Sequence, residues 1–165
     1  MDRAGCKAMM TTHFEVPQGM ERRMVVRLLR YWRELAGASR SYPSRSELDP
    51  RAMGDTWPSC FVLDHSADRD DPAIEYVGEA LGALCGAPDK GTPASAIAAE
   101  SLLAHAASRA GAAVSLKVPI VFGGEFRNRG DESLLYRGIL APLGVEPNGV
   151  THLLGAASAR VGPPG

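Results

Sequence analysis

The chain has 165 residues, a length that suits one domain with a single hydrophobic core. Its 18 lysines and arginines nearly balance its 19 aspartates and glutamates, and the formal net charge of −1 argues against a domain built mainly to bind nucleic acid or an anionic membrane surface. The three cysteines, Cys6, Cys60 and Cys85, lie far apart without CxxC spacing, which argues against a disulfide framework or a zinc site and indicates a reducing compartment.

The first segment, residues 1–18, mixes polar residues, methionine, proline and glycine without a period, and we expect a mobile tail. No long apolar run follows its charged residues, as a signal peptide would require, and no stretch of the chain approaches the roughly 18 apolar residues of a membrane helix. We therefore expect a soluble, cytoplasmic protein without membrane contact. A single domain over residues 19–158 follows, and residues 159–165 are predicted to form a C-terminal tail.

An amphipathic helix is predicted within residues 19–37, beginning near Met20 and ending at Gly37. Its apolar arc is wider than one sheet contact usually uses. Either the whole arc packs on the domain's own sheet, or part of it packs on a second copy of the chain. We predict a homodimer through this helix, with an interface made by Val25, Leu28, Leu29 and Trp32. The arginines on the opposite side are typical of a solvated face rather than of a nucleic-acid surface.

Two short helical turns are predicted in the connector after this helix. Ser44 and Glu47 have the spacing of a capping box, in which each side chain satisfies a backbone N–H of the other residue. Asp49 and Pro50 supply a second start, with Asp as the cap and Pro at the first helical position.

The sheet core is predicted over residues 59–158 and begins with a hairpin. Residues 59–65 and 73–78 read as strands, and the turn-forming residues 67–72 join them. A short helix over residues 79–85 follows.

A long helix is predicted from Thr92 and Pro93, as cap and first helical residue, to Gly111 just past its end. Its apolar side consists of small residues and leucines. Such a side either approaches a sheet closely or leaves room for something between helix and sheet.

Three extended runs complete the chain, at residues 113–121, 133–141 and 151–158. The first alternates strictly between apolar and other residues, the pattern of a strand with one buried face. Because the links between the runs are short and rich in turn-forming residues, we predict a three-stranded antiparallel meander.

The order of these elements and several motifs resemble a bacterial subfamily of PAS domains. The resemblance covers roughly residues 24–157 and is carried by nine short segments: Leu29-Arg-Tyr-Trp-Arg-Glu-Leu35, Pro43-Ser-Arg45, Leu48-Asp-Pro50, Trp57-Pro58, Phe61-Val-Leu-Asp64, Tyr76-Val-Gly-Glu-Ala-Leu81, Leu84-Cys-Gly86, Leu135-Tyr-Arg-Gly-Ile-Leu-Ala-Pro-Leu143 and Leu153-Leu-Gly155.

The resemblance implies an α+β fold, with a five-stranded antiparallel sheet, helices on one face and a flanking N-terminal helix. It also implies a sensory or interaction module for signal transduction rather than an enzyme. PAS domains commonly hold a small molecule between the sheet and the long helix, or dimerise through an N-terminal helix. We therefore expect a small ligand or an unidentified signalling protein as the partner. The alternative is an adaptor with a filled core and no ligand.

A ligand cavity between the sheet and the helices is predicted to be lined by residues of both. The predicted lining is Val62, Tyr76, Leu84, Leu102, Leu103, Leu116, Leu135 and Arg137. Arg137 either holds an acidic group inside the domain or lies at a rim with its head in water, and we favour the rim.

Cofactor chemistry has little support in the sequence. His105 lies where haem-binding PAS domains often carry their axial histidine, but on a helical wheel it falls about 100° from the centre of the apolar side, which favours the surface. Neither Cys60 nor Cys85 has the Asn-Cys-Arg-Phe-Leu-Gln motif of photoreactive flavin-binding PAS domains. We expect no metal at Asp64, His65 or the acidic loop after them, and no catalytic residues.

Overall fold

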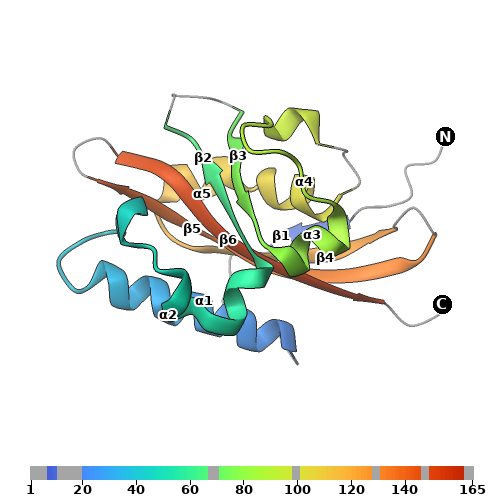
Figure 1. Ribbon diagram of the computed structural model, residues 1–165, viewed down its shortest axis with the longest axis horizontal. Helices are drawn as coiled ribbons and strands as arrows, with labels where there is room; N and C mark the ends of the chain where they lie inside the picture. Colours follow the sequence, from blue (N-terminus) through green and yellow to red (C-terminus); the bar gives the residue numbers. More distant parts are fainter. Residues whose placement is uncertain are drawn as a thin grey trace.

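The computed structural model describes residues 7–10, 20–66, 71–97, 101–127, 131–145 and 149–161, and the side chains of these residues except 7–10, 20–22 and 126. One antiparallel sheet forms the middle layer (Figure 1), with strand order β1-β4-β5-β6-β2-β3. Its strands are β1 (Lys7–Met10), β2 (Cys60–Asp64), β3 (Ala73–Val77), β4 (Ile120–Arg127), β5 (Ser133–Val145) and β6 (Gly149–Val161).

Helices cover both faces of the sheet (Figure 1). On one face lie α1 (Met20–Ala36) and α2 (Pro50–Met53), and on the other lie α3 (Glu79–Cys85), α4 (Leu102–Ala107) and α5 (Ala110–Leu116). Three 3₁₀ turns, η1 (Arg45–Glu47), η2 (Gly54–Ser59) and η3 (Ala94–Ala96), complete the elements of the described residues. In this part of the chain no helix is both long and apolar enough to cross a membrane.

The sheet therefore separates two hydrophobic cores. The α1 core lies between α1 and the sheet and contains Met24, Val25, Leu28, Trp32, Tyr42, Met53, Cys60, Val62, Val121, Ile139, Ala141, Leu143, Leu154 and Ala156. The α4–α5 core lies on the opposite face and contains Phe61, Leu63, Ile74, Leu81, Leu102, Leu103, Ala106, Ala107, Ala110, Ala113, Ile120, Phe122, Leu134, Tyr136, Leu140, Leu153 and Ala157.

The predicted fold class is confirmed: strands β2 to β6 form the expected five-stranded antiparallel sheet, with α1 as the flanking N-terminal helix. The sheet has one strand more than predicted. Lys7–Met10 pair with Phe122–Glu125 of β4, so the prediction of a mobile tail is wrong for these four residues. Pairing satisfies backbone groups that β4 would otherwise leave open at an edge. The rest of residues 1–18 lies outside the described residues.

The C-terminal end of the sheet also extends further than predicted. Ala159, Arg160 and Val161 continue β6 and pair with Tyr136, Leu135 and Leu134 of β5. The predicted C-terminal tail over residues 159–165 is therefore wrong at its first three positions, because β5 is long enough to give them ladder partners.

Helix α1 packs on the chain's own sheet. Val25, Leu28 and Trp32 are 3%, 1% and 7% exposed in the α1 core, and Leu29 is half-buried at its margin. The Trp32 indole Nε1–H donates to the Pro142 carbonyl of β5 at 2.8 Å. Val25, Leu28 and Trp32 are therefore used within the chain and are not available to the predicted dimer interface, whereas Leu29 and the homodimer itself stay predictions.

The long helix predicted from Thr92 to Gly111 does not form as one element. Ser101 caps α4, its Oγ accepting from the Ala104 N–H at 3.0 Å, and Gly111 lies inside α5. Residues 113–116, predicted as strand, form the last turn of α5, and the next residue, Lys117, caps the helix in the left-handed conformation (φ 58°). Four alternating residues fit a strand and a helix equally well, and here Ala113 and Val114 pack in the α4–α5 core as part of the helix.

The connector forms both predicted turns. The Ser44 side chain caps η1, and the Ser44 N–H donates to Glu47 Oε1 at 2.9 Å, completing the capping box. Asp49 caps α2 by accepting from the Arg51 N–H at 3.0 Å. Arg40 adds an ion pair with Glu47, donating through Nη2 to Oε2 at 2.9 Å.

These contacts predict acid sensitivity in the connector. Hydrogen bonds from Arg40, and then from the Ser44 N–H, lower the pKa of Glu47 from 4.5 to about 2. Because the pKa of Glu47 is lower in the folded than in the unfolded chain, the ionised carboxylate stabilises the fold at pH values above about 4.5. This contribution is lost as the pH falls from about 4.5 towards 2. Because Arg40 is fully exposed, solvent screening keeps this contribution small. Between pH 4.5 and 2 the free energy of unfolding should depend less on pH for Glu47→Gln than for the natural chain. The same pH dependence in both proteins would refute the stabilising role of the ionised Glu47.

The outer edge of β3 is also occupied. The Ile74 N–H donates to the Thr92 carbonyl at 2.8 Å, and the Gly91 N–H donates to the Ile74 carbonyl at 2.7 Å. Ala73 and Pro93 form an isolated antiparallel bridge beside them. The segment from Gly91 to Pro93 thus lies along β3 in place of a further strand.

Candidate functional site

Aromatic rings fill the layer of the α4–α5 core next to the sheet. Phe61 of β2 is paired with Gly155 of β6, and Phe122 of β4 is paired with Gly138 of β5. A Cβ atom added to Gly155 would lie 2.2 Å from Phe61 Cζ, and one added to Gly138 would lie 2.4 Å from Phe122 Cζ. Each ring therefore covers a cross-strand glycine, and both rings are at most 1% exposed. A ligand at this depth would have to displace one of them.

The residues predicted to line one cavity lie in different places. Leu102 and Leu103 are in the α4–α5 core, whereas Val62 and Tyr76 face the α1 core, where Tyr76 stacks on Trp57 with ring centroids 4.4 Å apart.

The other four residues of the predicted cavity lining lie apart from Leu102 and Leu103 and from Val62 and Tyr76. Leu84 and Leu116 are 44% and 56% exposed. Leu135 and Arg137 are half-buried and alternate with Leu134 and Tyr136, which point into the α4–α5 core. The predicted residues therefore do not line one cavity. For the strand residues Val62 and Tyr76 the reason is that a one-residue error in register exchanges the two faces of a sheet, whereas Leu84 and Leu116 lie on exposed parts of helices.

His105 lies beside Tyr136 at the margin of the α4–α5 core. Its Nδ1 is 3.0 Å from the Tyr136 hydroxyl, and the two rings meet edge to face with centroids 5.5 Å apart. Burial raises the pKa of Tyr136, and the charge of Arg109 partly opposes this rise.

The two described cysteines are poor nucleophiles. The Cys60 thiol is fully buried in the α1 core and donates to the Thr56 carbonyl, with Sγ and O 3.3 Å apart. Burial raises the pKa of Cys60 to about 12 and also raises that of Cys85. Since the thiolate is the reactive form, burial disfavours reaction at both thiols. Cys6 lies outside the described residues.

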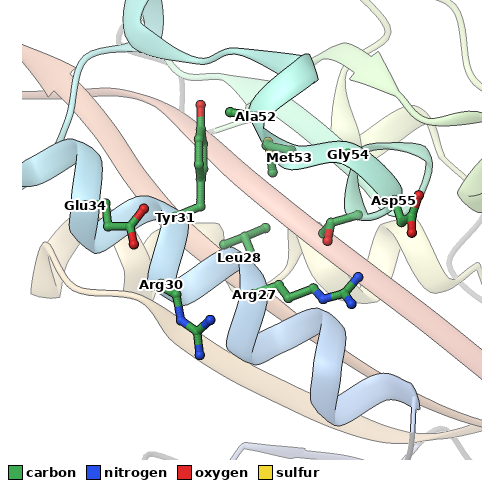
Figure 2. Close-up of a pocket in the computed structure, with 10 residues that line it drawn as sticks. Arg27, Leu28, Arg30, Tyr31, Glu34, Ala52, Met53, Gly54 and Asp55 are labelled. Carbon is green, nitrogen blue, oxygen red and sulfur yellow. The ribbon is translucent and has the colours of Figure 1, made fainter.

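A groove of about 340 Å³ opens on the α1 side of the molecule (Figure 2). Leu28 and Tyr31 rise from α1 towards Ala52 and Met53 of α2, and Asp55 lies at the end of the groove near Arg27. Its lining is Arg27, Leu28, Arg30, Tyr31, Glu34, Ala52, Met53, Gly54, Asp55 and Thr56. The groove thus combines an apolar floor with charged side chains at its rim.

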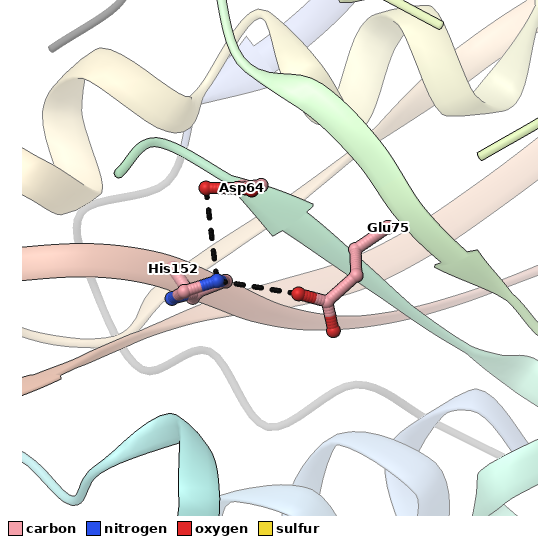
Figure 3. A group of neighbouring side chains, drawn as sticks. All are labelled: Asp64, Glu75 and His152. Atoms are coloured by element: carbon pink, nitrogen blue, oxygen red, sulfur yellow. Dashed lines mark ion pairs between the residues drawn. The ribbon is translucent and has the colours of Figure 1, made fainter. Parts of the chain in front are cut away.

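A second polar group lies where β2, β3 and β6 meet (Figure 3). His152 Nε2 is 3.2 Å from Glu75 Oε1 and 3.6 Å from Asp64 Oδ1. Arg45 Nε donates to the other Glu75 oxygen, Oε2, at 2.6 Å. No sequence pattern predicts this group, because strand pairing and a bulge bring its three residues together and they have no regular spacing along the chain.

The bulge lies in β3. Val62 pairs with Tyr76 and the next residue, Leu63, pairs with Ile74, so Glu75 has no partner in the β2 ladder. An extra residue of this kind changes the direction of a side chain. Here Glu75 turns towards Arg45 and His152.

Comparisons with known proteins place the chain in a family. No curated protein sequence matches it. Among solved structures it is similar to an RNA-binding light-oxygen-voltage receptor, with 20% identity, a TM-score of 0.47 and coverage of 70% of this chain and 35% of the receptor chain. It is also similar to the PAS domain of the fruit-fly ELK potassium channel, with 15% identity, a TM-score of 0.44 and coverage of 66% of this chain and 91% of the other.

The chain therefore spans about a third of the length of the receptor. The family model described as "PAS domain" matches residues 20–158, which include α1, both hydrophobic cores and nearly all of the sheet. This chain belongs to the PAS domain family, a family of sensory and signalling modules.

Proposed function

We propose that this chain is a non-catalytic PAS signalling module of the cytoplasm that acts through contact with a partner protein, with its α4–α5 core filled by its own side chains. The observation that carries the proposal is the covering of Gly155 and Gly138 by the rings of Phe61 and Phe122. In this arrangement protein atoms occupy the space next to the sheet. The signal is then received or passed on through contacts at the surface of the domain, and not through a ligand in the core.

The groove on the α1 side supplies a surface suited to a protein segment. Its floor includes Leu28 and Met53, and Arg27 and Arg30 stand at its rim. Glu34 and Asp55 also line the groove, so its charged groups are of both signs. A segment with an apolar side chain flanked by charged groups of both signs would match these features, because charged groups at a rim favour partners of complementary charge. A partner that binds one arrangement of α1 against the sheet more tightly than another shifts the population towards it.

The filled core is tested on the purified chain without added cofactor. Native and denaturing mass spectra should give the same mass per chain, and the absorption spectrum should contain only the tryptophan and tyrosine bands. A small molecule that is present in the native spectrum and lost on denaturation would overturn the filled core and restore the ligand sensor. The native spectrum also reports the oligomeric state, so it tests for a homodimer in the same measurement.

The role of the groove is tested with two charge-reversal variants of α1. Arg30→Glu changes the rim of the groove, whereas Arg23→Glu changes an exposed arginine of the same helix that does not line it. In cross-linking and affinity capture from the source cell, a partner recovered with the natural chain and with Arg23→Glu should be lost with Arg30→Glu. Equal recovery by both variants would exclude this groove as the contact.

A further inference from the structure

Three side chains at the junction of β2, β3 and β6 have the composition and spacing of a metal site. One nitrogen of His152 and one oxygen each of Asp64 and Glu75 lie within 4.8 Å of one another. In a tetrahedral zinc site with bonds of about 2.0–2.1 Å, two ligand atoms are about 3.3 Å apart. The distances from His152 Nε2 to the two carboxylates, 3.2 Å and 3.6 Å, bracket that value.

The site is built on paired strands rather than on loops. Asp64 and His152 are partners in the β2–β6 ladder, and the bulge in β3 delivers Glu75 to them. The Ser66 N–H donates to Asp64 Oδ1 at 2.7 Å, which further fixes that carboxylate. The side chains of Glu75 and His152 are each 16% exposed, whereas Asp64 is 38% exposed. An ion can therefore enter past Asp64 and find two partly desolvated ligands behind it.

Two neighbours orient these ligands. Thr151 Oγ1 lies 2.8 Å from His152 Nδ1, and when Nδ1–H donates to it the lone pair of Nε2 faces the two carboxylates. Arg45 occupies Glu75 Oε2 and leaves Oε1 on the side of His152. Outer contacts of this kind set the tautomer of a histidine ligand and hold a carboxylate to one oxygen.

From this geometry we infer that Asp64, Glu75 and His152 bind one divalent transition-metal ion of the zinc class, with water in the fourth position. Mixed nitrogen and oxygen ligands suit Zn²⁺ and Co²⁺ better than the all-oxygen shells of Ca²⁺ and Mg²⁺. The competing account is an ion-pair network in which a protonated His152 bridges the carboxylates, and Arg45 neutralises the remaining charge. The metal site does not depend on the proposed partner contact.

The test uses the full chain, with Zn²⁺ and Co²⁺ as probes. Equilibrium dialysis should give one bound Zn²⁺ per chain, and Co²⁺ should give the visible absorption of a tetrahedral site. Both signals should be lost in Glu75→Gln and His152→Gln and retained in His105→Gln, which changes a histidine outside the site. No stoichiometric binding by the natural chain, or binding that survives in both ligand variants, would overturn the inference.

A third variant keeps the test decisive if the ligand variants unfold. Thr151→Val preserves all three ligands and removes only the hydroxyl near His152 Nδ1. Loss of such an outer contact typically weakens metal binding by about 10–100-fold, and we expect that range here. An unchanged Zn²⁺ affinity in Thr151→Val, with an unchanged Co²⁺ spectrum, would place the metal elsewhere.

Discussion

Replacing Trp32 with alanine is expected to lower the free energy of unfolding by about 3–5 kcal/mol, the usual range for removal of a buried tryptophan. Trp32 is 7% exposed in the α1 core, and its indole N–H donates to the Pro142 carbonyl. Alanine would leave a cavity between α1 and β5 and an acceptor without its donor. Since most domains are stable by about 5–15 kcal/mol, the variant should unfold at a markedly lower urea concentration.

A matched control lies on the same helix. Val26 is 38% exposed, and Val26→Ala should change the free energy of unfolding by no more than about 0.5 kcal/mol, as surface substitutions usually do. Urea unfolding of the two variants beside the natural chain gives the comparison. If Trp32→Ala instead kept the natural stability and halved the native mass, Trp32 would be part of a dimer interface, as the sequence alone predicted.

Replacing Phe61 with alanine is expected to lower the free energy of unfolding by a similar amount, about 3–5 kcal/mol. The ring is fully buried and covers the Gly155 backbone, so its loss opens a cavity against the sheet. Gly155→Ala should by itself be destabilising by about 1–3 kcal/mol, because the new methyl group would overlap the ring.

The two changes together test the contact directly. With the ring removed, a methyl group at position 155 has space, so Gly155→Ala in the Phe61→Ala background should have a much smaller effect than in the natural chain. Urea unfolding of the four proteins gives the interaction free energy, which should be at least about 0.5 kcal/mol, as for residues in contact. Additive effects would mean that Phe61 does not fill the space over Gly155, and would weaken the argument for a filled core.

Helix and turn starts and stops that depend on neighbouring residues were predicted correctly from the sequence. The arc of α1 ended by Gly37, the capping box of Ser44 and Glu47, and the Asp49–Pro50 start each depend on residues within a few positions of one another, and all three are present. The prediction of a strand at residues 113–116 was wrong because four alternating residues fit a strand and a helix equally well. Packing of this segment in the α4–α5 core favours the helix.

The candidate sites could not be predicted in the same way. Asp64, Glu75 and His152 come together only through the β2–β6 register and the bulge opposite Val62 and Leu63. Neither the strand register nor the bulge can be recognised from the spacing of residues along the sequence. For the same reason the predicted cavity combined residues from two faces, since alternation along a strand shows that the faces differ without showing which one meets α1.

The segment from Gly91 to Pro93 has a consequence for how the sheet meets other chains. An open outer strand offers unpaired backbone groups to any extended peptide and is a common start of aggregation. At Ile74 both backbone groups are already used by Thr92 and Gly91, and the neighbouring bulge interrupts the regular spacing that an added strand would need. An incoming strand therefore cannot pair with β3 at Ile74, which hinders edge-to-edge association with other copies through this part of the sheet.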